Sequence, residues 1–286
     1  MAKLPKRANE RINAGLKRFQ PILVSAKSRD VNESDTVVIV TDLLQEIFGY
    51  DKFTEITSEY TIRGTRCDLA VKLDGDLALL IEVKAVGLDL KEQFVKQVVD
   101  YAANQGVEWV ALTNGAVWRV YKVGFGKPIQ HEMVVNFDLV AMNPRKDEHI
   151  ELLGLLAKEG WQKANLGEYH TQQQALSRFT LGALILSEPV LDVLRRQLRR
   201  LSPDVHLDAN EIKAALEADV LKREVLEGEK ANAARTQVAK ATAKALRKSR
   251  PTAETRAVPD LDEDIPCAKP SDELSAGSIP AGTAAS

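Results

Sequence analysis

Residues 60–85 read YTIRGTRCDLAVKLDGDLALLIEVKA, and this stretch decides the fold. The turn-forming triplet Asp74-Gly75-Asp76 separates two runs rich in strand-forming side chains, which predicts an antiparallel hairpin. The second run is continuously apolar from residue 77 to 81, as expected of a central strand that is covered on both faces. The hairpin therefore predicts a sheet flanked by helices, which is an α/β fold.

The same hairpin places three charged residues near one end of the central strand. Asp68 and Glu82 are equidistant from Gly75 in the sequence, so we expect them nearly opposite each other, with Cβ atoms about 5 Å apart. Two carboxylates at this separation can share one divalent cation. Lys84 projects on the same side as Glu82, because strand side chains alternate between faces. A Glu and a Lys at the end of an apolar strand are costly unless they are paired or bind a metal ion.

Helices and further strands are predicted around this hairpin. Residues 32–48 carry apolar side chains at the spacing of one buried helical face. Asp89 followed by Glu92 predicts a capping box that starts a second helix, which runs to Gln105. The turn pair Asn114-Gly115 is a strong hairpin signal. The remaining strands are predicted at residues 53–62, 108–113, 116–123 and 131–140.

The chain outside this sheet is predicted to be helical, with charged or low-complexity ends. Residues 1–30 hold eight Lys or Arg against two acids, and a solvated leader helix is the more common form of such a charge run. A basic helix follows residue 232, and it either contacts phosphates or faces water. From residue 251 onward the composition has no periodicity and predicts disorder. The predicted domains are a basic leader at 1–30, a sheet domain at 31–145, a helical region at 146–232, and a basic helix with a disordered tail at 233–286.

Composition excludes several classes of function. The formal net charge of −2 argues against a polyanion binder that uses its whole surface, so nucleic-acid contacts must come from local patches. The two cysteines, Cys67 and Cys267, are too far apart in sequence for a disulfide framework or a zinc motif. No apolar run reaches the roughly 18 residues that span a bilayer, and the first residues lack a secretory signal. These features predict a cytoplasmic protein without a membrane partner.

The charged residues of the hairpin resemble a nuclease motif. Asp68 followed by Glu82-Val83-Lys84 is similar to the signature of the PD-(D/E)xK nuclease superfamily, although Cys67 stands where that motif has Pro. On the second predicted helix, Gln97 and Tyr101 form a QxxxY pair, and their spacing places them side by side. The segments LLQEIFGYD, YTIRGTRCDLAV, LLIEVKA and TNGAVWRVY are similar to the N-terminal nuclease domain of type I restriction enzyme R subunits.

This resemblance implies a fold and a set of site residues. The implied fold is a restriction-endonuclease-like core, with a mixed central sheet flanked by helices, followed by a helical C-terminal region and a disordered tail. The implied cofactor is Mg²⁺, with Mn²⁺ as an alternative, and Lys84 would position the attacking water. An acid from the first helix of the sheet domain often joins such sites, and Glu33 is the first candidate and Glu46 the second. The implied residues are Asp68, Glu82, Lys84, Gln97 and Tyr101 for catalysis, and Asp68, Glu82, the Val83 carbonyl and Glu33 for the metal.

Three functions are open at this point. The first is a Mg²⁺-dependent DNA endonuclease that acts in restriction or defence, with DNA as its partner and a homodimer left open. No ATP hydrolysis is expected, because the chain has no GxxxxGK[ST] phosphate loop. Arg63 and Arg66 either hold phosphates beside the site or are ordinary surface arginines. The alternatives are a noncatalytic nucleic-acid-binding or regulatory module on a nuclease scaffold, and a helical interaction adaptor.

Overall fold

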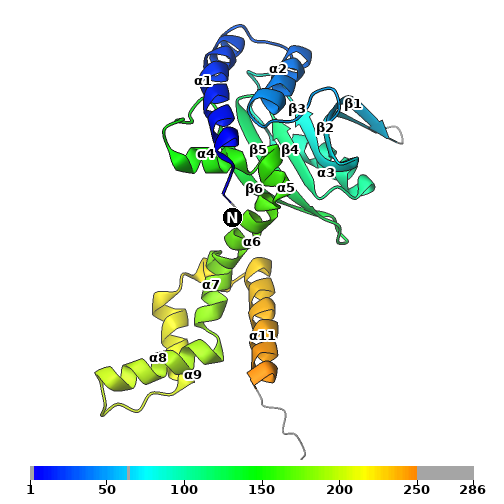
Figure 1. Cartoon of the computed structure of the whole chain (residues 1–286). Helices are drawn as coiled ribbons and strands as arrows, with labels where there is room; N and C mark the ends of the chain where they lie inside the picture. The colour runs from blue at the N-terminus through cyan, green and yellow to red at the C-terminus, as the bar shows by residue number, and fades with distance from the viewer. Residues whose placement is uncertain (1–2, 63–64, 250–286) are drawn as a thin grey trace, which may run out of the picture. The chain divides into compact units, whose positions relative to one another are not determined.

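The protein is built around one mixed, six-stranded sheet whose strands follow each other in sequence order (Figure 1). The computed structural model describes residues 3–62 and 65–249. Neighbouring strands are antiparallel except β3 and β4, which are parallel. The predicted α/β class with a mixed sheet is confirmed. The strands are β1 (Ile56–Ile62), β2 (Thr65–Leu73), β3 (Asp76–Val83), β4 (Trp109–Thr113), β5 (Val117–Gly124) and β6 (Gln130–Asp138).

The hairpin of β2 and β3 has the register that the sequence predicts. Leu69 pairs with Ile81, and Ala70 pairs with Leu80, so the two strands are symmetric about Gly75 over this stretch. A bulge after Val71 shifts the register close to the turn. Asp74 and Gly75 have φ values of 52° and 91°, and this left-handed pair closes a tight turn between the strands.

The crossover between the parallel strands is the helix α3 (Glu92–Gln105). Its apolar stripe packs on one face of the sheet, in a cluster with Leu80, Val110 and Leu112. The helix ends at Gly106 in the left-handed conformation, which favours glycine. The predicted capping box is wrong, because α3 starts at Glu92 after Lys91 and no side chain caps it. Leu90 is buried and its carbonyl accepts a hydrogen bond from β5, so the preceding segment is held extended against the sheet.

Two helices cover the other face of the sheet, α1 (Lys6–Ser28) and α2 (Glu33–Glu46). The side chain of Asn32 caps α2 by accepting a hydrogen bond from the Asp35 amide. One face of α1 is fully buried and belongs to the same apolar cluster as the sheet. The prediction of a solvated leader helix is therefore wrong for this face, although the basic side chains of α1 other than Arg11 are exposed. The division of the chain into independent domains stays a prediction.

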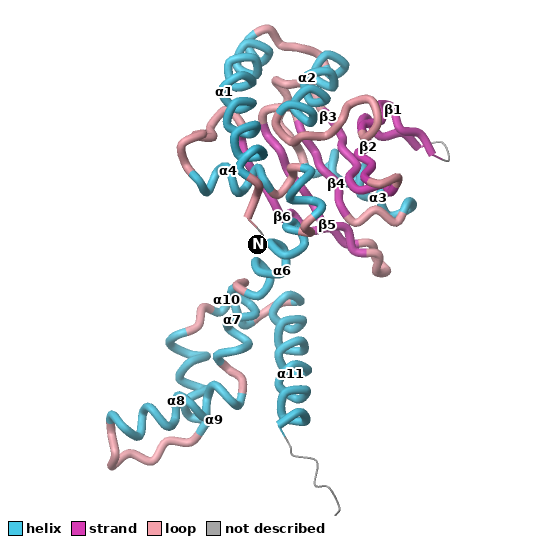
Figure 2. The backbone as a smooth tube through the Cα atoms, in the orientation of Figure 1, coloured by secondary structure: helices cyan, strands magenta, loops and turns pink. Residues whose placement is uncertain are grey.

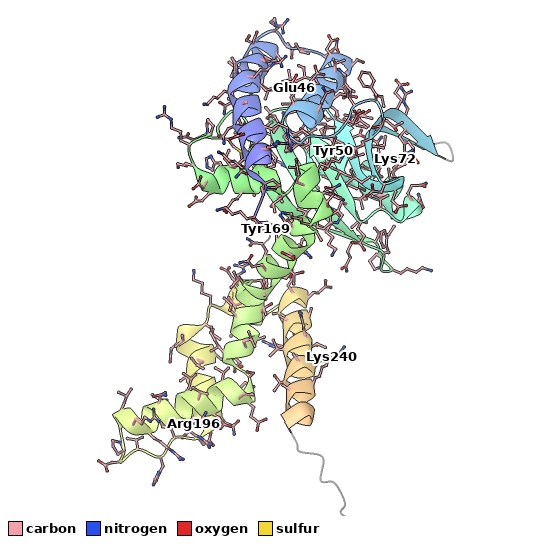
Figure 3. All side chains as sticks on the ribbon, viewed as in Figure 1. Glu46, Tyr50, Lys72, Tyr169, Arg196 and Lys240 are labelled. Carbon is pink, nitrogen blue, oxygen red and sulfur yellow. The ribbon has the colours of Figure 1, made fainter. Side chains whose placement is uncertain are left out.

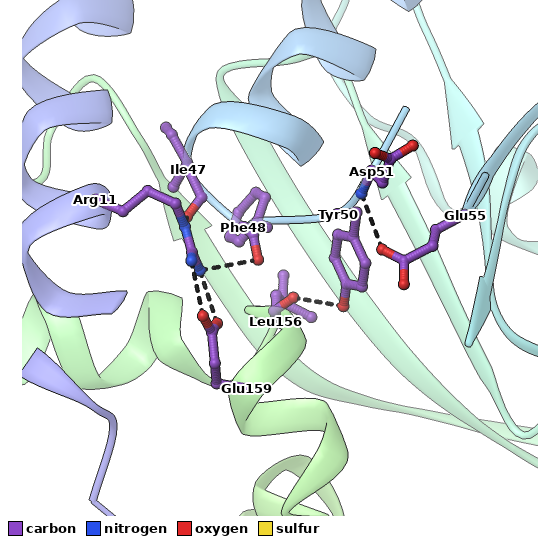
Figure 4. Close-up of polar contacts among 8 residues, drawn as sticks. All are labelled: Arg11, Ile47, Phe48, Tyr50, Asp51, Glu55, Leu156 and Glu159. Atoms are coloured by element: carbon purple, nitrogen blue, oxygen red, sulfur yellow. Dashed lines mark hydrogen bonds and ion pairs between the residues drawn. The ribbon is translucent and has the colours of Figure 1, made fainter. Parts of the chain in front are cut away.

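Figure 4 shows how α1 is bonded to a segment that precedes the sheet in the sequence and to a helix that follows it. Arg11 donates hydrogen bonds at 2.7 Å to both carboxylate oxygens of Glu159, through Nη1 and Nη2. Nη2 also donates to the Phe48 carbonyl, and Nε donates to the Ile47 carbonyl. Glu159 belongs to α5 (Lys158–Gln162), the second helix after the sheet. One guanidinium group thus connects three parts of the chain: α1, α5, and the turn that follows α2.

After β6 the described chain is helical, as predicted, and Figure 2 shows no strand beyond that point. Contacts divide the chain into Met1–Val238 and Ala239–Ser286, and of the second unit the structure describes residues 239–249. The predicted disordered tail lies outside the described residues, as does Arg63. Within the described part of the chain, every helix is too short or too polar to traverse a lipid bilayer. The helices are α4 (Asp147–Gly154), α5 (Lys158–Gln162), α6 (Asn165–Ala175), α7 (Arg178–Ile185), α8 (Glu188–Leu201), α9 (Ala209–Ala215), η1 (Leu216–Val220), α10 (Arg223–Leu226) and α11 (Glu229–Ser249).

Candidate active site

A buried ion pair lies at the carboxyl end of β3. Glu82 is only 4% exposed, although it is a carboxylate on the strand that pairs with both β2 and β4. Lys84 follows directly after the strand, and its backbone amide donates to the Thr113 carbonyl at 2.8 Å, which continues the parallel ladder. The Lys84 ammonium group lies 2.8 Å from Glu82 Oε1. The two side chains therefore meet on the same side of β3, as the strand alternation predicts.

Asp68 reaches the same point from β2. The regular pairing of β2 with β3 begins at Leu69, one residue beyond Asp68. Instead of continuing the ladder with its backbone, Asp68 accepts a hydrogen bond through Oδ2 from the Val83 amide at 2.7 Å. The Asp68 carboxylate is thus bound to the backbone of Val83, the residue that separates Glu82 from Lys84 in the sequence.

The amino-terminal end of α2 adds a third acid. Glu33 Oε2 lies 3.4 Å from the Lys84 ammonium group. The first turn of α2 is held there by Thr36, which is fully buried and whose hydroxyl accepts a hydrogen bond from the Val86 amide. Glu46, which is labelled in Figure 3, is at the opposite end of α2, about 20 Å further along the helix. It forms an ion pair with Arg18. Of the two acids weighed from the sequence, the structure brings Glu33 to the site and leaves Glu46 away from it.

Burial dominates the electrostatics of this cluster. It raises the pKa of Glu82 and of Asp68 above their ordinary values, and nearby acids add to this rise. Lys84 lowers both pKa values and the Val83 amide lowers that of Asp68, but the net shift is upward. Burial lowers the pKa of Lys84, but the hydrogen bond to Glu82 and the surrounding carboxylates more than reverse this, so its pKa lies above the usual lysine value. Lys84 is therefore a cation at neutral pH, and it acts on its neighbours through charge.

The arrangement of an acid on β2 and Glu-x-Lys at the end of β3 leads to the comparison with known families. Residues 37–135 match the family of the type I restriction enzyme R protein N terminus. The match runs from α2 into β6, so it covers the whole sheet up to its last strand, and it confirms the predicted resemblance. Neither the curated proteins nor the solved structures contain a match to the chain.

Two more residues within the part that matches the restriction R family lie on α3. Tyr101 is buried in the apolar cluster on this face of the sheet, and its hydroxyl donates to the Tyr60 carbonyl at 3.1 Å. Gln97 is exposed, and it lies one helical turn after Phe94. The Phe94 ring lies 5.7 Å from the Lys84 ammonium group. This face of α3 thus borders the site through Phe94, while Tyr101 joins α3 to β1.

The cluster offers oxygen ligands of the kind that Mg²⁺ takes. Glu33, Asp68 and Glu82 carry three carboxylates against the single ammonium group of Lys84. Among residues 3–62 and 65–249, no three His, Cys, Asp or Glu side chains are grouped as ligands of one metal ion. Mg²⁺ commonly uses only one or two carboxylates, with water and substrate phosphate in its other positions. Asp68, Glu82 and the Val83 carbonyl fit that pattern.

Several contacts at the site were not predicted from the sequence. Thr36 and Phe94 fix the position of Glu33 and Lys84, but each has the residue type and spacing of an ordinary packing position. Arg66 forms an ion pair with Glu59 on β1, which fits a surface arginine as well as a phosphate ligand. One sequence signal pointed to Thr36. It lies one turn after the Asn32 cap of α2, close to Glu33, the first acid of that helix.

Proposed function

We propose that this chain is a metal-dependent DNA endonuclease that hydrolyses phosphodiester bonds. The observation that carries the proposal is the buried Glu82, 4% exposed at the end of an apolar strand, with Lys84 and Asp68 beside it. A fold gains little from burying this pair, because an apolar pair of similar size is often at least as stable. The match to the restriction R family over residues 37–135 supports a role for the pair in DNA cleavage.

The roles of the residues follow from their charges and positions. Asp68, Glu82 and the Val83 carbonyl would hold a divalent cation, Mg²⁺ or Mn²⁺, with Glu33 near Lys84 at the rim. When bound, such a cation supplies Lewis-acid stabilisation of the charge on the scissile phosphate. Lys84 would stabilise negative charge that develops on the phosphate and orient the attacking water. Gln97 and Tyr101 stand as candidate catalytic residues by resemblance alone.

A noncatalytic DNA-binding or regulatory module is the second candidate. It is favoured by one observation, the 2.8 Å pairing of Lys84 with Glu82, which is also what a purely structural ion pair would show. In that case the carboxylates would have no need to bind a cation. The two functions therefore differ in whether a divalent cation binds at Asp68 and Glu82.

Calorimetric titration of Mn²⁺ or Mg²⁺ into the metal-free protein separates these functions without a known substrate. We expect one binding event in the wild type, its loss in Asp68→Ala, and its retention in Asp76→Asn. Asp76 is an exposed carboxylate at the start of β3, so it controls for the removal of one negative charge from the same hairpin. Equal heats in the wild type and in Asp68→Ala would remove the basis for a metal-dependent mechanism.

Plasmid nicking in Mg²⁺ or Mn²⁺ tests the chemistry itself. We expect the wild type and Asp76→Asn to nick DNA and Lys84→Ala to lose the activity, because Lys84 supplies the only cation that contacts Glu82 among the described residues. Equal nicking by the wild type and Lys84→Ala would assign the activity to another part of the chain or to a contaminant.

A further inference from the structure

Arg119 on β5 lies in the same transverse row of the sheet as Glu82. Glu82 pairs with Leu112 on β4, and Leu112 pairs with Arg119. Paired residues on adjacent strands project to the same face, so Arg119 lies on the face of the sheet that carries Glu82 and α3. Two strand spacings separate the backbones of Arg119 and Glu82, which is about 10 Å.

The guanidinium group of Arg119 is fixed but not neutralised. Nη1 donates to the Leu90 carbonyl at 2.8 Å, in the segment that leads from Lys84 to α3. Nε is buried and makes no hydrogen bond of good geometry among the described residues. The guanidinium group does interact with the Tyr121 hydroxyl, whose pKa is raised by burial and partly lowered by Arg119, but this neutral group does not balance its charge. In the described part of the chain no carboxylate forms an ion pair with Arg119, and Glu92, the acid in the first turn of α3, is hydrogen-bonded to His131 instead. A partly buried cation without a counterion is costly unless an anion reaches it.

The position of this cation relative to the candidate site suggests which anion it meets. The Lys84 ammonium group contacts the Phe94 ring, and the Leu90 carbonyl contacts Arg119, so the first residues of α3 and the segment before them lie between the two cations. A DNA strand whose scissile phosphate lies at Glu82 and Lys84 carries further phosphates on either side. An arginine fork matches phosphate oxygens well, and a guanidinium group that is already held in place loses little entropy on binding one.

We propose that Arg119 binds a DNA phosphate next to the scissile one and so fixes the position of the strand over Asp68 and Glu82. The inference rests on the proposed endonuclease function and extends it to how the substrate is held. Arg119 is a substrate-binding and positioning residue in this scheme, and it takes no part in proton transfer. A merely structural role, in which Arg119 only pins the segment before α3, makes a different prediction for the salt dependence of DNA binding.

The test measures duplex DNA binding by fluorescence anisotropy in EDTA over a range of salt concentrations. Each phosphate contact contributes about 0.9 to the slope of log K against log salt. We expect Arg119→Gln to lower this slope by about 0.9 and to weaken binding about tenfold. Lys122→Gln is the matched control, because Lys122 lies on the same strand with the same charge, and it contacts Trp109, which packs against the apolar cluster on the other face.

Two further measurements separate phosphate binding from a structural role. Arg119→Lys keeps the charge and is expected to retain the slope while it loses part of the affinity. In nicking assays Arg119→Gln is expected to raise KM with little change in kcat, as for a contact made equally in the ground and transition states. Should Arg119→Gln not fold, Arg119→Met, which keeps the apolar stem, replaces it with the same expected results.

The outcomes distinguish this inference from the function on which it rests. A wild type that binds and nicks DNA, together with an Arg119→Gln variant of wild-type slope, would overturn the inference and leave the proposed function intact. A slope that falls equally in Arg119→Gln and Lys122→Gln would also overturn it, because the effect would then reflect net charge alone. A wild type that neither binds nor nicks DNA would remove both.

Discussion

Removal of the Lys84 ammonium group should destabilise the protein strongly at neutral pH and much less in acid. Lys84→Met keeps most of the apolar stem and leaves Glu82 without its counterion. The side chains of Lys84 and Glu82 are only 13% and 5% exposed, so water cannot replace the lost partner. The penalty is thus the desolvation of a carboxylate that the fold keeps buried.

The magnitude follows from this burial. Loss of one partner from a fully buried ion pair costs about 3–5 kcal/mol. The Lys84 side chain keeps some contact with water, so we take the lower end of this range, about 3 kcal/mol. Glu33 contributes little to the loss, because its side chain is 49% exposed and lies 3.4 Å from the ammonium group. For a folded unit of this size, about 3 kcal/mol corresponds to a fall of about 6–12 °C in the unfolding midpoint.

The raised pKa of Glu82 determines how the loss of stability in Lys84→Met changes with pH. The pKa of Glu82 is raised in the folded protein, so its ionisation costs stability as the pH rises from the ordinary carboxyl range through the raised value. Without the ammonium group this raised pKa moves further up. Thermal unfolding followed by circular dichroism should therefore show the full loss at about pH 8 and a smaller loss at about pH 5, where a larger share of Glu82 is protonated.

Two variants make this prediction refutable. Glu82→Gln combined with Lys84→Met removes both charges and should recover most of the lost stability. Lys52→Met breaks an exposed pair, in which Lys52 lies 3.7 Å from Asp42 with side chains 36% and 43% exposed, and should cost less than about 1 kcal/mol. An equal loss at both pH values, or a double variant no more stable than Lys84→Met, would show that the ion pair does not have the energetic role argued above.

Three further predictions concern the cation, the Arg11 cluster and the helix packing. Mg²⁺ should raise the unfolding midpoint of the wild type more at high pH than at low pH, because protons compete for carboxylates of raised pKa, and Asp68→Asn should abolish the shift in a thermal-shift assay. Arg11→Lys should cost about 2 kcal/mol in urea unfolding, since lysine cannot form the two parallel bonds to Glu159 and also reach two carbonyls. Gly15→Ala in α1 should destabilise by about 1 kcal/mol despite the better helix propensity of alanine, because a Cβ there would lie 2.6 Å from an isoleucine side chain after α2. Gly167→Ala in α6, where a Cβ meets nothing within 4 Å, should instead stabilise by about 0.5–1 kcal/mol, and equal effects at the two glycines would refute the packing argument.

The register of the β2–β3 hairpin agrees with the prediction, but the turn alone does not produce it. Next to the turn Leu73 pairs with Asp76, and this register, if continued, would place Asp68 opposite Ile81. The bulge after Val71 shifts the pairing by one residue, so that Leu69 pairs with Ile81, and no sequence pattern predicted this bulge. The positions of Glu82 and Lys84 on one side then follow from strand alternation alone. This part of the site depends on local geometry, and sequence patterns report local geometry well.

The errors arose where tertiary contacts outweigh local preference. Asp89 has the residue type of a helix cap, yet the burial of Leu90 and its bond to Arg119 delay the start of α3 until Glu92. In α1 the excess of basic residues hid an apolar stripe that continues from Ile12 to Phe19 and beyond, and that stripe is buried against the sheet. For α3 the deciding partner, Arg119, is distant in sequence, so no local pattern could predict the start of the helix. For α1 the helical spacing of Ile12, Leu16, Phe19 and Leu23 did indicate a buried face, and the charge run was given more weight.

The charges at the site connect its stability with its proposed chemistry. With Glu33, Asp68 and Glu82 around one ammonium group, the folded protein at neutral pH carries more negative than positive charge in a poorly solvated place. Lys84 offsets part of this repulsion, and a divalent cation would offset the remainder, so cation binding and folding stability must be linked at these residues. A purely structural ion pair needs one carboxylate for one ammonium group. The second and third acids are what the proposed divalent-cation site would use, and calorimetry on Asp68→Ala measures whether a cation binds there.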